Sequence, residues 1–146
     1  MNPQIKPITA IAYEPWLSLW AGYLGAQFES MGADVHQGTF ARLHDPKSSL
    51  QGVVAINDRP VGLAHFYLHP STYSLAPACT LDDLYVAPDC RGQGVARQLI
   101  EAVATQAREA GSYVLHWKTR DSNLSAISLY DKIGGRTGFL SYRLDL

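Results

Sequence analysis

The chain has 146 residues, a formal net charge of −1, 47% hydrophobic residues and 17% charged residues. This length and composition predict a single domain over residues 1–146 with a buried core, and they exclude an intrinsically disordered chain. The near-neutral charge excludes the basic surface that nucleic acids and anionic membranes attract, so neither is an expected partner. The N-terminal residues contain neither a long apolar run nor a basic, Ser-rich stretch, and we expect a soluble cytoplasmic protein.

The N-terminal third predicts a strand and two helices. Residues 5–12 are typical of a strand, and Pro15 stands where the first turn of a helix accepts proline. The helical spacing that follows is carried by Trp16, Leu19, Trp20, Tyr23 and Gln27. Residues 30–34 are predicted as a loop, and residues 35–43 as a short helix or an irregular segment that ends before Pro46.

The middle of the chain predicts three strands. Residues 50–56 and 61–68 form two of them, and the tight connection Asn57-Asp58-Arg59-Pro60 joins them as a hairpin. Residues 78–86 predict the third strand, which leads directly into a glycine-rich turn.

The C-terminal half alternates helices and strands. One face of the next predicted helix carries Val95, Leu99, Val103 and Ala107. Gly111 ends this helix, residues 113–117 predict a strand, and a further helix runs to Ile133. Residues 138–146 alternate as a final strand does. This order predicts an α+β fold with a mixed central sheet flanked by helices.

The glycine-rich turn, residues 91–96, reads Arg-Gly-Gln-Gly-Val-Ala. Glycines before a helix let the backbone approach a ligand, and the free N–H groups at the helix start favour a pyrophosphate. A nucleoside-triphosphate loop needs a lysine where Val95 stands, and a dinucleotide fingerprint needs a glycine where Arg97 stands. The spacing of Arg91, Gly94 and Ala96 instead resembles the coenzyme A loop of the GNAT superfamily of N-acetyltransferases.

A second motif carries the same resemblance. Residues 123–135, from Asn123 through Ala126 and Tyr130 to Gly135, are similar to the family pattern Asn-x-x-Ala-x-x-Leu-Tyr-x-Lys-x-Gly-Phe, with Gly135 where Phe is usual. The resemblance implies the GNAT fold, with acetyl-CoA as cosubstrate between two splayed strands. Because few residues follow the last helix, the edge of the sheet is open to a second copy, and we expect a homodimer.

The resemblance also assigns roles to residues of this sequence. The implied coenzyme contacts are Leu84, Tyr85, Val86, Arg91, Gly92, Gln93, Gly94, Val95, Ala96, Arg97 and Asn123. Tyr130 is the implied general acid, since an unperturbed phenol has a pKa of about 10, close to that of a thiol. Two alternatives stay open: an ordinary Gly-rich turn for the loop, and simple packing for Tyr130.

Asp82 and Asp83 are adjacent on a predicted strand, so their side chains should point to opposite faces. Leu-Asp-Asp-Leu-Tyr-Val most resembles the diamine (spermidine/spermine) acetyltransferases of the superfamily. The resemblance implies that Asp82 takes the proton of the amine through water and that Asp83 binds a cationic substrate. A structural role for either aspartate stays open.

Several further side chains are candidates for the substrate site. Tyr67 and Tyr73 flank the loop before the acidic strand, and Glu29 corresponds to a substrate contact of the diamine acetyltransferases. The aromatic side chains of the first helix could surround a cation, but Trp16 and Trp20 are predicted as core.

Cys79 and Cys90 and the five histidines lack metal-ligand spacing, so no metal is expected. His65 and His116 are predicted to have packing or surface roles. The sequence therefore predicts an N-acetyltransferase acting on the primary amine of a polyamine, a diamine or an amino-acid-like compound. Acetylation of a protein or antibiotic amine, and a non-catalytic coenzyme A-binding module, are the alternatives.

Overall fold

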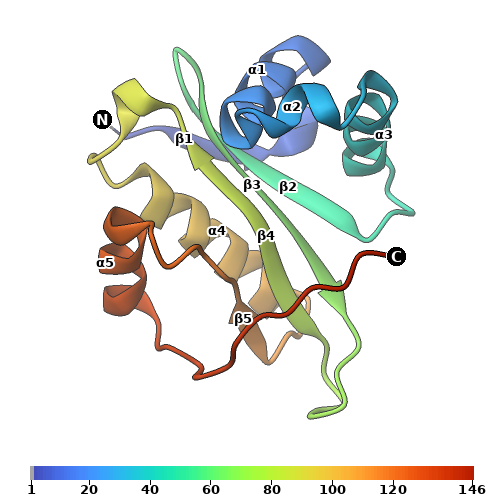
Figure 1. The fold of residues 1–146 in the computed structure, drawn as a ribbon, viewed down its shortest axis with the longest axis vertical. Coiled ribbons are helices and arrows are strands. Elements are labelled where there is room, and N and C mark those ends of the chain that lie inside the picture. Colours follow the sequence, from blue (N-terminus) through green and yellow to red (C-terminus); the bar gives the residue numbers. More distant parts are fainter. Residues whose placement is uncertain (1) are drawn as a thin grey trace.

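The computed structural model describes residues 2–146, and its centre is a five-stranded sheet with strand order β1-β2-β3-β4-β5 (Figure 1). The strands are β1 (Gln4–Pro7), β2 (Leu50–Asn57), β3 (Arg59–His69), β4 (Ala78–Val86) and β5 (Val114–His116). Pairing is antiparallel from β1 through β4 and parallel between β4 and β5. The mixed sheet of the α+β prediction is confirmed.

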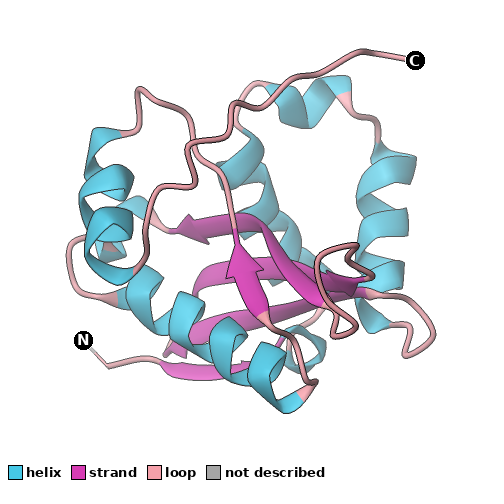
Figure 2. Cartoon of the chain, turned by 90° about the horizontal axis from the view of Figure 1, so that it is seen from below, coloured by secondary structure: helices cyan, strands magenta, loops and turns pink. Residues whose placement is uncertain are grey.

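Helices cover both faces of this sheet (Figure 1, Figure 2). They are α1 (Tyr13–Leu24), α2 (Gln27–Ser30), α3 (Ala33–His44), α4 (Val95–Glu109) and α5 (Leu124–Ile133). The cluster on the α1 and α3 side includes the fully buried Trp16 and Leu63, and the cluster on the α4 side includes Phe66 and Leu99. No helix among residues 2–146 is long and apolar enough to cross a membrane.

Helix α4 follows its predicted pattern. Val95, Leu99, Val103 and Ala107 recur every fourth residue and are all buried against the sheet. The helix ends just before Gly111, whose φ of 80° is left-handed, as the sequence predicts. This helix therefore places its N-terminus at the end of β4, where residues 91–94 form the connection.

The N-terminal third differs from its prediction in its boundaries. β1 ends at Pro7 and a 3-10 helix (Ile8–Ala10) replaces the rest of the predicted strand. α1 ends at Leu24 because Gly25 adopts a φ of 59°, so Gln27 belongs to the separate turn of α2. α3 then begins two residues earlier than predicted.

The predicted strand over residues 138–146 is wrong for the single chain. These residues form no strand with any part of the described chain, and Figure 2 shows the segment standing off from the sheet. The segment carries five exposed apolar side chains: Phe139, Leu140, Tyr142, Leu144 and Leu146. The alternation is real, but a strand needs a neighbouring backbone, and this chain supplies none there.

Candidate active site

The strands β4 and β5 separate after a short paired stretch. β4 pairs with β5 only over Ala78–Thr80 among the described residues, whereas its pairing with β3 continues to Val86. The Ala87 N–H donates to the Val61 carbonyl at 2.8 Å. Because antiparallel hydrogen-bonded pairs alternate, the backbone groups of Leu84 and Val86 point away from β3, toward the gap that β5 leaves. This is the splay that the resemblance implies.

The glycine-rich turn is an open cradle. Gly92 and Gly94 have φ values of 73° and 83°, and a Cβ built at either would meet no atom of residues 2–146 within 4 Å. Gly94 precedes α4 and accepts the Gln98 N–H, and no side chain of the described residues caps the helix. The N–H groups of residues 95–97 are therefore available to an anion, with the positive end of the helix dipole behind them.

Arg91 ties this turn to the strand before it. Its Nε donates to the Val86 carbonyl at 2.8 Å, and its guanidinium carbon lies 5.5 Å from the centre of the Tyr85 ring. The Val86 carbonyl is thus occupied, which leaves the Val86 N–H and the Leu84 groups for a ligand. The structure places Gln93 beside the two glycines on the exposed turn, and the Arg97 side chain reaches along α4 to Glu101.

A β-bulge shapes the acidic end of the gap. His65 of β3 lies opposite Asp83, but the next residue, Phe66, lies opposite Leu81, so Asp82 is the extra residue of β4. Burial raises the pKa of the Asp82 carboxyl, and the charge of Asp83 raises it further, while Lys118 opposes the shift. Because Asp82 is exposed to solvent, which screens both causes, the shift makes it only a slightly stronger proton acceptor than an ordinary aspartate.

Tyr23 of α1 joins this acidic pair. Burial raises the pKa of its phenol above the ordinary value, and the charge of Asp83, then that of Asp82, adds to the shift. Its ring stacks on Trp20 at 5.6 Å and meets Tyr85 edge-on at 6.4 Å. The sequence left Tyr23 as one of several aromatic residues, and its position three residues after Trp20 was the available signal.

Tyr130 and Asn123 occupy the other side of the gap, on α5. The Tyr130 ring packs edge-on against Trp117, with centroids 5.4 Å apart. Burial raises the pKa of Tyr130, so its phenol stays protonated at neutral pH and can donate a proton. Tyr130 also adds to the raised pKa of Tyr23, which places both phenols within electrostatic reach of each other. Asn123 precedes the first turn of α5 and donates to Thr119 at 3.4 Å.

His65 was predicted to pack, and it does: its side chain is 1% exposed. It also lies 3.0 Å from the Asp83 carboxylate, through Nδ1 and Oδ2. The pattern offered one signal for this contact, a histidine inside an otherwise apolar run of β3.

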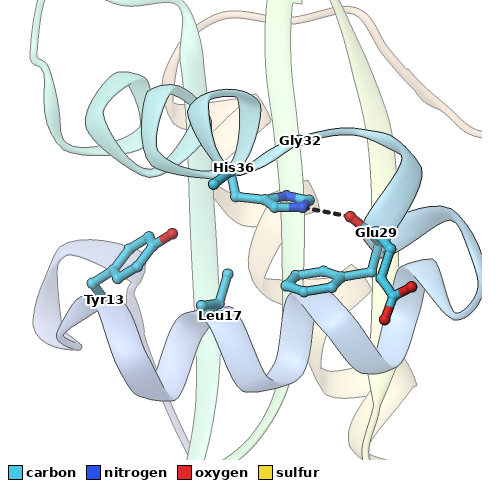
Figure 3. Close-up of a pocket in the computed structure, with 7 residues that line it drawn as sticks. Tyr13, Leu17, Glu29, Gly32 and His36 are labelled. Atoms are coloured by element: carbon cyan, nitrogen blue, oxygen red, sulfur yellow. Dashed lines mark hydrogen bonds between the residues drawn. The ribbon is translucent and has the colours of Figure 1, made fainter.

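The remaining substrate candidates lie apart from the acidic pair. Tyr67 of β3 stands opposite Thr80, and Tyr73 is 88% exposed on the loop before β4. Glu29 lines a cavity of about 170 Å³ between α1, α2 and α3 (Figure 3). The cavity residues are Tyr13, Leu17, Phe28, Glu29, Gly32, Ala33 and His36. Neither aspartate is part of this lining, so the structure does not unite Glu29 with them.

Neither cysteine takes part in a disulfide or a metal site within residues 2–146. Both side chains are buried, and burial raises the pKa of the Cys79 thiol to about 11. A thiol in this state is a poor nucleophile at neutral pH. The chemistry of the gap therefore depends on the carboxylates, the phenols and the open helix start.

A strand splay that ends at an uncapped, glycine-lined helix start defines the acetyltransferase class, and the chain belongs to the acetyltransferase (GNAT) family, which its sequence matches over residues 11–135. It is 34% identical to the D-amino-acid N-acetyltransferase of Saccharomyces cerevisiae over 142 residues, 95% of this chain and 88% of that protein. It is 32% identical to the thialysine N-epsilon-acetyltransferase of Caenorhabditis elegans over 127 residues, 82% of this chain and 79% of that protein.

A solved structure has the same fold. The ribosomal-protein-alanine N-acetyltransferase of Brucella melitensis biovar Abortus 2308 superposes with a TM-score of 0.79 and 25% identity, covering 98% of each chain. The protein is an acetyl-CoA-dependent N-acetyltransferase with the GNAT fold. The alternative of a non-catalytic coenzyme A-binding module is set aside.

Proposed function

We propose that this enzyme acetylates the primary amine of a small, cationic, amino-acid-like substrate by direct attack on acetyl-CoA in a ternary complex. The observation that carries the proposal is the acidic pair Asp82 and Asp83, which lies beside Tyr23 where the strands separate. The negative potential that raises the pKa of Tyr23 also attracts an ammonium group. The names of the relatives, D-amino acids and thialysine, support an amino-acid-like amine.

Acetyl-CoA is proposed to lie along the free edge of β4. The diphosphate accepts hydrogen bonds from the N–H groups at the start of α4, and the glycines at 92 and 94 leave space for it. The pantetheine arm pairs with backbone groups of Leu84 and Val86. Asn123 is proposed as a further contact to the coenzyme. These contacts hold the thioester beside the bulge at Asp82.

Three proton transfers accompany the reaction. The substrate arrives as an ammonium held by Asp83, and Asp82 accepts one proton through water, which leaves a neutral amine. The amine nitrogen attacks the thioester carbonyl, a C–N bond forms, and the C–S bond breaks. The phenol of Tyr130 donates its proton to the departing thiolate, and the second amine proton restores the phenol through solvent. The raised pKa of Asp82 suits a proton acceptor, and the raised pKa of Tyr130 keeps its phenol protonated until the thiolate departs.

A panel of amines tests this function through the release of the coenzyme A thiol. The panel contains D-amino acids, thialysine and lysine, diamines and polyamines, an aminoglycoside and peptides with free N-termini. We expect the small amino-acid-like cations to give the largest kcat/KM. Preference for the peptides or the aminoglycoside would favour the alternative substrates. Tyr67 and Tyr73 remain substrate-site proposals, with Glu29 the weakest of them.

We further propose that the enzyme is a homodimer in which residues 138–146 pair with a second copy. Apolar residues alternate at 140, 142, 144 and 146 and are exposed in the single chain, and Arg143 pairs with Asp145. The edge of β5 is short, and its Val114 is 36% exposed. A second copy offers the missing strand partner. Light scattering on the purified chain at micromolar concentration should give twice the chain mass, and a monomeric mass would contradict the proposal.

A further inference from the structure

His65 is the central member of a buried hydrogen-bond chain that joins helix α1 to the acidic pair. The Trp16 indole nitrogen Nε1 lies 3.1 Å from His65 Nε2. On the other side of the imidazole ring, Nδ1 lies 3.0 Å from Asp83 Oδ2. Trp16 and His65 are 0% and 1% exposed, so water does not compete for these bonds.

The chemistry of the indole determines the form of His65. An indole N–H can only donate, so His65 Nε2 must accept and carries no proton. The proton of the neutral ring is then on Nδ1, which donates to Asp83. A doubly protonated ring would place two N–H groups opposite each other at 3.1 Å in the core, which costs the indole its partner.

Asp83 therefore accepts a hydrogen bond from the buried His65 ring, which fixes the position of its carboxylate. Oδ2 is occupied by His65, and the Tyr23 phenol also hydrogen-bonds the Asp83 carboxylate, so an ammonium group would bind beside these two partners. The Asp83 side chain is 18% exposed, which leaves a path to the gap between the strands.

We propose that His65 is a positioning residue for acetyl transfer: Trp16 fixes it as an Nδ1–H donor, and in this form it holds the Asp83 carboxylate in place for the substrate amine. The proposal rests on the function proposed above, and it adds two buried residues that touch neither substrate nor coenzyme.

The charged groups around His65 explain why its neutral form matters. Asp83 and Asp82 face it from β4, Tyr23 lies on the α1 side, and the residue opposite it on β2 is the uncharged Gly52. Lys118 is the cation that acts on Asp82. A proton on His65 would offset the charge of Asp83 and would lower the pKa of Asp82. The first effect weakens the attraction of the acidic pair for an ammonium group. The second makes Asp82 a weaker proton acceptor.

The first test reads the tautomer and needs no activity. The ¹⁵N and ¹H signals of the His65 ring in the full-length protein should report a neutral ring with its proton on Nδ1 near neutral pH. A proton on Nε2, or a cationic ring, would overturn the proposal. Because this measurement uses no substrate, its result is independent of whether the proposed amine is acetylated.

The second test uses two matched variants of α1. Trp16→Phe removes the indole donor to His65, and Trp20→Phe removes an equivalent buried donor, from Trp20 Nε1 to His36 Nδ1 at 3.0 Å. His36 bonds the Phe28 carbonyl through its other nitrogen, and a phenylalanine at position 20 keeps an aromatic ring against His65 and Tyr23. Thermal unfolding shows whether each variant is folded before its kinetics are compared.

The readout is the ratio of variant to wild-type kcat/KM for the amine as pH falls. Free histidine side chains gain charge between about pH 8 and pH 5, so the Trp16→Phe ratio should fall at least about three-fold across that range. The Trp20→Phe ratio should stay level, and titration of the substrate cancels in both ratios. A level ratio for Trp16→Phe would overturn the proposal, whereas turnover of no amine at all would count against the proposed function instead.

A pair of substitutions at position 65 separates positioning from packing. Asn places an N–H near the position of Nδ1 and can still donate to Asp83, while Gln places its polar group near Nε2 and cannot. Each leaves one buried group without its partner, so the stability losses should be similar. We expect His65→Asn to keep the KM for the amine within about two-fold, and His65→Gln to raise it by about ten-fold, about 1.4 kcal/mol. Equal KM values for the two variants would overturn the proposal.

Discussion

Gly94 offers a direct test of the anion site at the start of α4, because Gly111 beyond the other end of the helix is a matched control. Gly94 has a φ of 83° and Gly111 a φ of 80°, and a Cβ at either position would meet no atom of the described chain, residues 2–146, within 4 Å. Alanine at either site therefore costs left-handed backbone strain without a clash, about 1–2 kcal/mol. For a chain of this size the loss corresponds to a fall in Tm of roughly 3–6 °C.

The two variants should differ in coenzyme binding alone. In Gly94→Ala the new methyl group enters the open space through which the diphosphate is proposed to approach the N–H groups of residues 95–97. We expect the Kd of acetyl-CoA, measured by calorimetry, to rise by about ten-fold or more, about 1.4 kcal/mol. Gly111→Ala should leave this Kd unchanged. Equal affinities in the two variants would refute the placement of the diphosphate at the start of α4.

Three further predictions concern the proton transfers and the core. Tyr130→Phe should lower kcat by about 100-fold while the Kd of acetyl-CoA changes little, because the phenol is proposed to donate a proton and not to bind the coenzyme. Steady-state kinetics measure kcat and calorimetry measures the Kd. An unchanged kcat would remove the assignment. Asp82 has a raised pKa in the folded state, so the stability it contributes is present below its unfolded pKa of about 3.9 and is lost as pH rises through the folded pKa. Asp82→Asn should consequently raise the Tm near neutral pH, give no gain at about pH 3, and reduce kcat/KM for the amine; a lower Tm at neutral pH would contradict the sign. Leu99 is fully buried at the centre of the α4 cluster, so Leu99→Ala should cost about 2–5 kcal/mol in urea unfolding, and a loss under about 1 kcal/mol would mean that the site collapses around the cavity.

Local patterns in the sequence were enough to predict helix α4 and the glycine-rich turn before it. The four-residue spacing from Val95 to Ala107 is a property of one helix, and the turn that precedes it has its own glycine spelling. Both features involve residues close together in the chain, so neither depends on how distant segments pack. The GNAT fold and the acetyltransferase class, which the sequence predicted from these local motifs, are confirmed by the family match over residues 11–135.

The acidic side of the site depends on contacts that no local pattern contains. Adjacent aspartates on a regular strand point to opposite faces, but the bulge at Asp82 is a property of the register between β3 and β4. His65 meets Trp16 across 49 positions and Asp83 across 18. The end of α1 and the start of α3 were missed because Gly25 and Gly32 adopt left-handed conformations that spacing alone does not reveal.

Helix α1 combines the core and the site on one face, which is why its aromatic residues could not be sorted from the sequence. Trp16 and Trp20 are buried as predicted, yet each indole donates to a buried histidine, and Tyr23 one turn further on lies beside the aspartates. A phenylalanine at either tryptophan would satisfy the same apolar pattern and remove the donor. Hydrophobic spacing therefore constrains where α1 packs, while the indole nitrogens constrain which protons the buried histidines hold. Under the proposed function, substitutions on this helix should alter stability and the pH dependence of catalysis together at Trp16, and stability alone at Trp20.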